Sequence, residues 1–293
     1  MHFASGIVRP PFEAACEFLQ VTSGCSHDDC KFCTFYKDAR FAVSDIDEIE
    51  ADLEELAQSP WRYYSRIWLQ GADPFVLPYD KLARIAELIY EKLPWVTSIG
   101  AYARATNFKN KTEGQLKALA DAGFSRLSVG IESGDDDLLK RMKKGYDSAF
   151  ALEQMAKVDA AGLSWVGQFI NGLGGHGYGD KHAIDTARFY NHLHPMMINA
   201  ASLTLFEDTP LYQDVLEGSF EEATENERLE ELRVLVENLE CETEFRLEHV
   251  SLPVRIIGNI PEDKGRIIEE LDRVLEMNSD GRLDHFRGSI VSL

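Results

Sequence analysis

Residues 17–33 read EFLQVTSGCSHDDCKFC, where an apolar stretch typical of a β-strand runs directly into a loop with three cysteines. Cys25, Cys30 and Cys33 are separated by four and by two residues, in the pattern C-x4-C-x2-C. Thiolates this close in sequence can converge on one centre, and cysteine thiolates hold zinc or iron–sulfur clusters. We therefore expect a metal centre in the loop that follows the first strand.

The residues of this loop leave the kind of metal open. His27 lies between the first two cysteines and would complete a four-ligand structural zinc site in a non-enzymatic protein. An iron–sulfur carrier or sensor without catalysis is a further alternative. Cys16 and Cys241 stand alone, are too few for a second cluster, and are expected to be core thiols. Five cysteines, with three in one loop, indicate metal or redox chemistry in a reducing compartment rather than a disulfide framework.

Strand-like and helical segments alternate from the cysteine loop to about residue 203. A helix is expected after Ser44 as its cap, with Asp47 at the capping-box position. Alternation without a long linker implies parallel strands joined by right-handed crossovers, in a doubly wound sheet or a barrel. We predict an α/β fold, a partial (β/α)6 TIM-like barrel, whose site is built from the loops after the strands. The expected strands are 17–22, 66–70, 95–101, 126–131, 164–170 and 196–203.

The pattern changes after about residue 210. An acidic helix is expected over residues 221–240, then an irregular stretch that contains Phe245, Arg246 and His249, then a helix from about residue 261. We predict that residues 1–210 form the barrel core and that residues 211–293 are a helical and irregular C-terminal extension that caps it.

Composition limits the class of ligand. The chain has 293 residues, 44% of them hydrophobic, which is enough for a large core. Its 50 acidic and 30 basic residues give a formal charge of −20, which argues against nucleic acid and against an anionic membrane surface as partners. No apolar run approaches the roughly 20 residues that span a bilayer, and the N-terminus lacks the pattern of a secretory signal. We expect a cytoplasmic protein with a small-molecule ligand.

The cysteine loop resembles the signature of the radical S-adenosylmethionine (SAM) superfamily. That signature is C-x3-C-x2-C after the first strand of an α/β barrel, with an aromatic residue before the third cysteine, as Phe32 is here. The first gap is one residue longer in this chain. Four later segments are similar, in order, to motifs of the subgroup that contains the elongator catalytic subunit, tRNA methylthiotransferases and oxygen-independent coproporphyrinogen oxidases: residues 71–74, 128–134, 170–175 and 203–212.

The resemblance implies a cofactor pair and a reaction. Cys25, Cys30 and Cys33 would hold a [4Fe-4S] cluster with one iron open to SAM. Reductive cleavage of SAM would then yield a 5′-deoxyadenosyl radical, which abstracts hydrogen from, or adds to, a small-molecule substrate. The residues that we assign to cofactor binding on this basis are Gly71, Ala72, Asp73, Arg104, Glu132, Gln168, Ile170, Gly172, Phe32 and Leu205.

The resemblance also implies a reductant, of the flavodoxin or ferredoxin type. The chain lacks the cysteines of a second cluster and a further domain for cobalamin or RNA, so we expect a minimal radical SAM enzyme, a monomer or simple homodimer. Catalytic side chains, the substrate and the reaction subclass are not assigned by the sequence.

Overall fold

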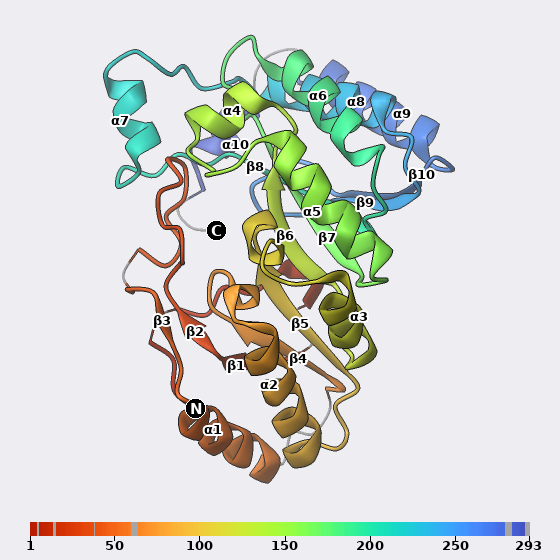
Figure 1. The fold of residues 1–293 in the computed structure, drawn as a ribbon. Helices are drawn as coiled ribbons and strands as arrows, with labels where there is room; N and C mark the ends of the chain where they lie inside the picture. The colour runs from red at the N-terminus through yellow and green to blue at the C-terminus, as the bar shows by residue number, and fades with distance from the viewer. Residues whose placement is uncertain (5, 14–15, 38, 60–63, 279–282, 291–293) are drawn as a thin grey trace. The chain divides into compact units, whose positions relative to one another are not determined.

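The computed structural model describes residues 1–293 except 5, 14–15, 38, 60–63, 279–282 and 291–293 (Figure 1). The chain divides into two compact units. The first contains residues 1–28, 35–130 and 153–165, and the second contains residues 29–34, 131–152 and 166–293. The division passes through the cysteine loop, so Cys25 belongs to the first unit and Cys30 and Cys33 belong to the second.

The sheet strands are ordered β1-β4-β5-β6-β7-β8-β9-β10. They are β1 (Glu17–Gln20), β4 (Arg66–Gln70), β5 (Ser98–Ala103), β6 (Leu127–Glu132), β7 (Trp165–Asn171), β8 (Met197–Ser202), β9 (Thr243–Leu247) and β10 (Ile256–Ile260). Strand pairs β1–β4, β4–β5, β5–β6, β7–β8 and β8–β9 are parallel, and β10 is antiparallel to β9. This mostly parallel sheet with connecting helices confirms the predicted α/β class.

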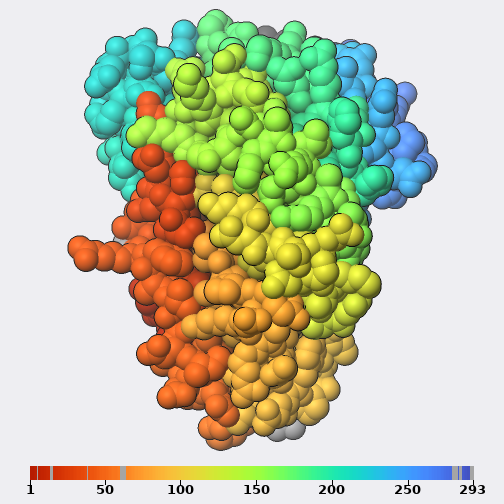
Figure 2. All heavy atoms as spheres, in the orientation of Figure 1, coloured from red at the N-terminus to blue at the C-terminus, as the bar shows by residue number. Residues whose placement is uncertain are grey.

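The first unit is built around β4. Its residues Ile67, Trp68 and Leu69 are fully buried, because a strand between two parallel neighbours is covered on both faces and is apolar throughout. The α-helices wholly within this unit are α1 (Ile46–Gln58), α2 (Tyr79–Lys92) and α3 (Glu113–Asp121). Helices α2 and α3 adjoin, as the orange and yellow regions of Figure 2 show. Leu82, Ile85 and Ile89, on one face of α2, are buried.

The second unit has helices on β7 and β8. Its helices are α4 (Asp136–Arg141), α6 (Gly179–Tyr190), α7 (Pro210–Leu216), α8 (Glu225–Asn238), α9 (Lys264–Met277) and α10 (Asp284–Arg287), and α5 (Ser148–Ala160) is divided between the units. Helices α6, α8 and α9 pack side by side (Figure 1). None of the helices in the described ranges combines the length and the apolar character that crossing a bilayer requires.

The expected irregular stretch after residue 240 is wrong in part. Phe245 and Arg246 lie in β9, which pairs with β8, and β10 pairs with β9; His249 lies in the connection. Residues Thr243, Phe245 and Leu247 of β9 are buried while Glu244 and Arg246 are half-buried. Covered and half-exposed residues therefore alternate along β9, a pattern that differs from the continuous apolar runs of the buried parallel strands such as β4.

Three expected boundaries differ from the structure. Helix α1 is capped by Asp45, with Glu48 in the capping box, because Ser44 hydrogen-bonds through its backbone to Val21 instead. The first predicted strand is split: β1 ends at Gln20, and β2 (Thr22–Ser23) pairs with β3 (Ala42–Val43). Strand β5 begins at Ser98 rather than residue 95, since a turn after α2 occupies residues 93–96.

Candidate functional site

The turn after β4 is joined to the start of the cysteine loop. The backbone N–H of Ala72 donates to the carbonyl oxygen of Gly24 at 3.2 Å. Gly71 has φ +124°, and a Cβ at this position would lie 1.9 Å from Oγ1 of Thr22. Only glycine combines that backbone conformation with that close approach. The predicted Gly71–Ala72 turn is therefore built directly against the residues that precede Cys25.

Asp73 organises the same loop. Its side chain is fully buried and accepts hydrogen bonds from the N–H of Ser26 at 3.1 Å, from the Ser26 hydroxyl, and from Nδ2 of Asn107 at 3.2 Å. Burial raises the pKa of the Asp73 carboxyl, and these three donors oppose that shift by stabilising the carboxylate. Asp73 thus links the residue after Cys25 to the loop after β5.

The loop after β5 carries the predicted Arg104. Its side chain is buried, and its backbone N–H donates to Oδ1 of Asn107 at 2.7 Å. Asn107 also donates to Asp73, so Arg104, Asp73 and the cysteine loop are connected through one amide side chain. Lys111 reinforces this loop, since its ammonium group donates to the carbonyl oxygens of Phe75 at 2.7 Å and Asn107 at 3.0 Å. Sequence reasoning missed both Asn107 and Lys111.

The five cysteines fall into two environments. Cys16 and Cys241 are buried, and burial raises the pKa of their thiols to about 12 and about 11, which confirms the core positions expected for them. Cys25, Cys30 and Cys33 are partly exposed. Within the described ranges, no group of three or more His, Cys, Asp or Glu side chains is arranged to hold a metal ion. Cysteine thiolates are the usual ligands of iron–sulfur clusters, and Cys25, Cys30 and Cys33 are the partly exposed cysteines of this chain.

In the second unit, the segment around Cys30 and Cys33 is held by its backbone. The N–H of Cys33 donates to the carbonyl oxygen of Cys30 at 3.4 Å, which places both residues on one turn. Lys31 donates its N–H to Met142 and accepts from the N–H of Leu211 at 2.9 Å. Chain segments more than 100 residues apart therefore orient this turn.

Three predicted cofactor residues meet around one apolar cluster. Phe32, Ile170 and Leu205 are partly buried and pack against the buried side chains of Met142, Leu173, Leu203, Leu211 and Phe220. Phe32 comes from the cysteine turn, Ile170 from β7 and Leu205 from the segment after β8. The structure thus gathers residues from the cysteine turn and two strand ends into one apolar surface.

Glu132, at the end of β6, is strained and paired. Its φ of +69° lies in the left-handed region, where a residue other than glycine costs of order 1–3 kcal/mol. The Glu132 carboxylate lies 3.5 Å from the ammonium group of Lys144, which is buried. Lys144 also lies over the ring of Phe32, at 5.8 Å. A buried lysine beside a predicted cofactor residue is a functional candidate that the sequence did not single out.

Gln168 lies on the face of the sheet opposite to helix α6. Its neighbour Phe169 packs on His182 of α6, so the alternation of a strand directs Gln168 to the opposite face of the sheet. Oε1 of Gln168 accepts a hydrogen bond from Nδ2 of Asn199 at 2.9 Å. Asn199 and Arg246 follow Gln168 in register across β8 and β9. A row of polar side chains therefore crosses the face of the sheet that α6 leaves uncovered.

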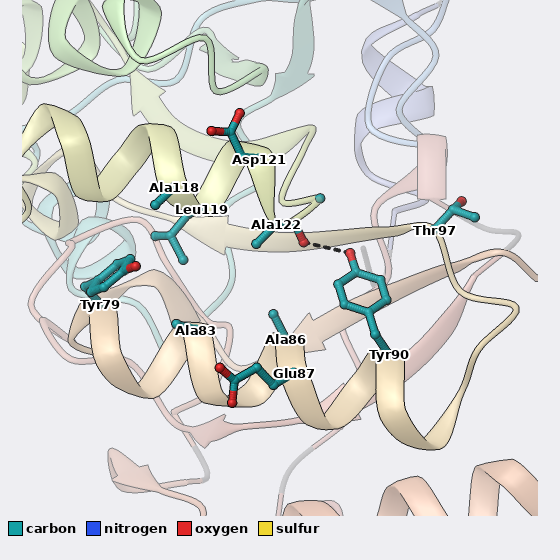
Figure 3. A pocket seen from close by; sticks show the side chains of 11 residues that line it. Tyr79, Ala83, Ala86, Glu87, Tyr90, Thr97, Ala118, Leu119, Asp121 and Ala122 are labelled. Atoms are coloured by element: carbon teal, nitrogen blue, oxygen red, sulfur yellow. Dashed lines mark hydrogen bonds between the residues drawn. The ribbon is translucent and has the colours of Figure 1, made fainter.

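A groove of about 530 Å³ lies between α2 and α3, away from these residues (Figure 3). Alanines and two tyrosines form most of its wall, and the hydroxyl of Tyr90 donates to the carbonyl oxygen of Ala122 at 2.8 Å. None of the predicted cofactor residues lines the groove. It is not the candidate site.

A family model described as the radical SAM superfamily matches residues 19–190. That segment is more than half of the chain, and this chain belongs to the radical SAM superfamily. The matched segment contains the three cysteines and ends at Tyr190, the last residue of α6. Family membership confirms the predicted resemblance, and with it the [4Fe-4S] cluster and SAM as the cofactors of the fold. It does not favour the zinc alternative with His27.

Two curated relatives cover part of the chain. Anaerobilin synthase from Escherichia coli O157:H7 is 29% identical over 146 residues, which are 46% of this chain and 32% of that protein. Heme chaperone HemW from Lactococcus lactis subsp. lactis (strain IL1403) is 26% identical over 140 residues, 47% of this chain and 36% of that protein. The chain thus spans about a third of the length of each relative.

Two solved structures share the fold. The radical SAM methyltransferase TsrM from Kitasatospora setae, with cobalamin and a [4Fe-4S] cluster bound, has a TM-score of 0.54 at 17% identity and covers 69% of this chain and 37% of its own. Methylornithine synthase (PylB) has a TM-score of 0.51 at 17% identity and covers 89% and 80%. At this identity the likeness supports the barrel-like fold alone.

Proposed function

We propose that this chain is a radical SAM enzyme that acts on a small-molecule substrate. The observation that carries the proposal is the C-x4-C-x2-C loop, inside the family segment, with the turn at residues 71–73 bonded to the residues on either side of Cys25. When bound, the cluster and SAM supply a 5′-deoxyadenosyl radical by reductive cleavage of the sulfonium bond. The protein's part is to bind, orient and exclude water.

Cys25, Cys30 and Cys33 would ligate the cluster. The residues that would hold SAM are Gly71, Ala72, Asp73, Arg104, Glu132, Gln168, Ile170, Gly172, Phe32 and Leu205. Lys144 joins this set, because a buried ammonium group beside Glu132 complements the two charges of an amino-acid zwitterion. The buried Asn107–Asp73 bond keeps the turn after β4 in place without any ligand.

The apolar cluster around Phe32 suits a radical reaction. Phe32, Ile170 and Leu205 contribute no polar side-chain group to this surface. A radical must be kept from solvent, and an apolar wall next to the cysteine turn does so.

The proposed partners follow from the net charge of the chain and from its membership of the radical SAM superfamily. A formal charge of −20 disfavours nucleic acid and anionic membranes as partners, so the partners would be a small substrate and a flavodoxin or ferredoxin-type reductant. We also propose a cytoplasmic monomer or simple homodimer, with a core over residues 1–210 and an extension over residues 211–293.

Anaerobic reconstitution tests the proposal. The protein should take up about four iron atoms per chain and, with dithionite and SAM, should release 5′-deoxyadenosine detectable by mass spectrometry. The variant Cys30→Ala, made in the same way, should do neither. A colourless protein that binds one zinc ion would contradict the proposal, and so would a full cluster that never cleaves SAM, as in an iron–sulfur carrier.

A further inference from the structure

We infer that helix α8, which lies beyond the family segment, positions the turn at residues 170–172 for the nucleoside part of SAM through Arg228 and Glu231. This inference rests on the proposed function, which assigns Ile170 and Gly172 to SAM. Arg228 and Glu231 act here as positioning residues, since they contact the backbone of the turn on the side of α8.

The carboxylate of Glu231 binds a backbone N–H of the turn at residues 170–172. The N–H of Gly172 donates to Oε2 of Glu231 at 3.0 Å, and the other carboxylate oxygen lies 2.8 Å from Nδ1 of His182 in α6. Glu231 is 2% exposed and His182 is fully buried. Because β7 ends at Asn171, the N–H of Gly172 lies beyond the strand ladder and needs a partner from elsewhere. A carboxylate from α8 supplies it.

Arg228 holds the carbonyl groups at the ends of two strands. Its Nη1 lies 3.4 Å from the carbonyl oxygen of Asn171, at the end of β7, and 3.1 Å from that of Leu203, just after β8. The side chain is 1% exposed, and its charge is balanced by Glu222, whose carboxylate lies 2.6 Å from Nη2. One guanidinium group therefore sets the spacing of the two strand ends that carry Ile170 and Leu205.

The guanidinium group of Arg228 packs closely against the turn at residues 170–172. A Cβ on Gly172 would lie 2.4 Å from Nη1 of Arg228, so the guanidinium group lies directly against the backbone of this glycine. Arg287 of α10 adds a second donor to the Leu203 carbonyl, at 3.2 Å, and pairs with Glu225 of α8 at 2.7 Å. Residues from the C-terminal part thus converge on the two strand ends.

The buried charges of Arg228 and Glu231 indicate that the backbone of the turn at residues 170–172 must be held in one geometry. A buried ion pair is often no more stabilising than apolar residues of the same size, so packing alone does not require one. A backbone turn that recognises a ligand must be held within about 0.5 Å of its binding geometry. The hydrogen bonds from α8 to the N–H of Gly172 and to the carbonyls of Asn171 and Leu203 provide that restraint.

The test measures ligand binding apart from turnover. The 293-residue chain is reconstituted anaerobically, and binding of S-adenosylhomocysteine, which is not cleaved, is measured by calorimetry. The variants are Glu231→Leu, Glu231→Gln, Arg228→Met and Arg228→Lys. The matched control is Arg233→Met, on the same helix but paired with Asp272 of α9.

Glu231→Leu and Arg228→Met should weaken binding by about tenfold or more with the iron content unchanged, since they remove contacts to the turn. Glu231→Gln retains an acceptor for the Gly172 N–H, and it should stay within about twofold of the wild type, as should Arg233→Met. Arg228→Lys keeps the positive charge but loses the planar set of N–H donors. Its affinity for S-adenosylhomocysteine should lie between those of the wild type and Arg228→Met. In the cluster-free protein, amide hydrogen exchange of residues 170–172 should accelerate in Glu231→Leu.

A folded Glu231→Leu protein with full iron content, wild-type binding and wild-type exchange would overturn the inference. If Arg228→Met does not fold, the comparison of Glu231→Leu with Glu231→Gln decides alone. Failure of the wild-type protein itself to bind S-adenosylhomocysteine, with the cluster intact, would instead contradict the proposed function; the exchange measurement then still decides whether α8 restrains the turn.

Discussion

At the scale of single residues, burial separates thiols that can serve a cluster from thiols that cannot. A thiol binds metal as the thiolate. Burial raises the pKa of Cys16 to about 12, so this residue stays protonated near neutral pH, whereas Cys25, Cys30 and Cys33 are partly exposed. Position in the fold, and not residue type, makes this distinction.

Cysteine variants test that distinction. Cys25→Ala, Cys30→Ala and Cys33→Ala should each lose most of the iron after anaerobic reconstitution, because a cubane held at three corners does not tolerate the loss of one ligand. Cys16→Ala and Cys241→Ala serve as controls and should keep about four iron atoms per chain, measured by colorimetric iron analysis. Iron loss in the control variants, or retention in the others, would contradict the assignment.

Lys144 and its neighbour Lys143 form a matched pair of residues in different environments. Lys144 is buried beside Glu132, whereas Lys143 is exposed and pairs with Asp29 at 3.2 Å. Removal of one member of a buried pair leaves an uncompensated charge and costs about 3–5 kcal/mol, whereas an exposed pair contributes at most about 1 kcal/mol.

Lys144→Met should therefore lower the free energy of unfolding by about 3 kcal/mol, and Lys143→Met should change it by less than about 1 kcal/mol. Urea titrations of the cluster-free protein measure both. The double variant Lys144→Met/Glu132→Gln should recover part of the loss, since it removes both charges. Equal effects of the two single variants would show that Lys144 is not a buried charge.

At the scale of elements, the loops after β4 and β5 are joined by one lysine. Lys111 donates to the carbonyls of Phe75 and Asn107, and its side chain is buried. Burial, together with the nearby charge of Lys157, lowers the pKa of Lys111 to about 8 from an ordinary value of 10.5. The two loops that carry Asp73 and Arg104 therefore depend on a group that titrates just above neutral pH.

This lowered pKa predicts a dependence of stability on pH. Between about pH 8 and pH 10.5 the unfolded chain keeps the Lys111 proton that the folded protein has released, so the unfolded state binds more protons. The contribution of Lys111 to stability thus rises with pH across this window, by about 3 kcal/mol at most. Urea titrations from pH 7.5 to 10.5 should show a steeper rise for the wild type than for Lys111→Met. Parallel curves would contradict the shift.

At the scale of the whole molecule, the second unit continues well past the family segment. The family model ends at residue 190, but β8, β9 and β10 extend the sheet and α8 packs on α6. Leu229, Leu232 and Val236 of α8 are buried. The part after residue 220 therefore contributes buried side chains to the core of the second unit.

A shortened chain of residues 1–219 tests this dependence. Without α8 the apolar face of α6 loses its cover, and β8 becomes an exposed sheet edge, a feature that favours aggregation. We expect the shortened protein to bind a hydrophobic dye and to lack a near-ultraviolet circular dichroism signal. The 293-residue chain should keep that signal and should not bind the dye. A monomeric shortened protein with a native-like spectrum would show that the C-terminal part is dispensable.

Local pattern was sufficient for much of the fold. The strands β4, β6 and β7 lie close to where their sequence pattern predicts them. The family and its cofactors follow from the spacing of three cysteines and the order of short motifs. The assigned cofactor residues and the boundary at residue 210 stay predictions.

The sequence by itself determined the residue types of the metal centre, the alternation of strands and helices, and the charge that limits the partners, since each of these is written in neighbouring positions. Only the tertiary structure decided that Thr243–Leu247 is a strand, that Asp73 bonds to Ser26 and Asn107, that Lys144 is buried beside Glu132, and that Arg228 reaches the ends of β7 and β8. The physical reason is separation along the chain. Whether a charged side chain is solvated or buried depends on partners that can lie more than 50 residues away, as Asn171 does from Arg228, and local periodicity carries no information about them.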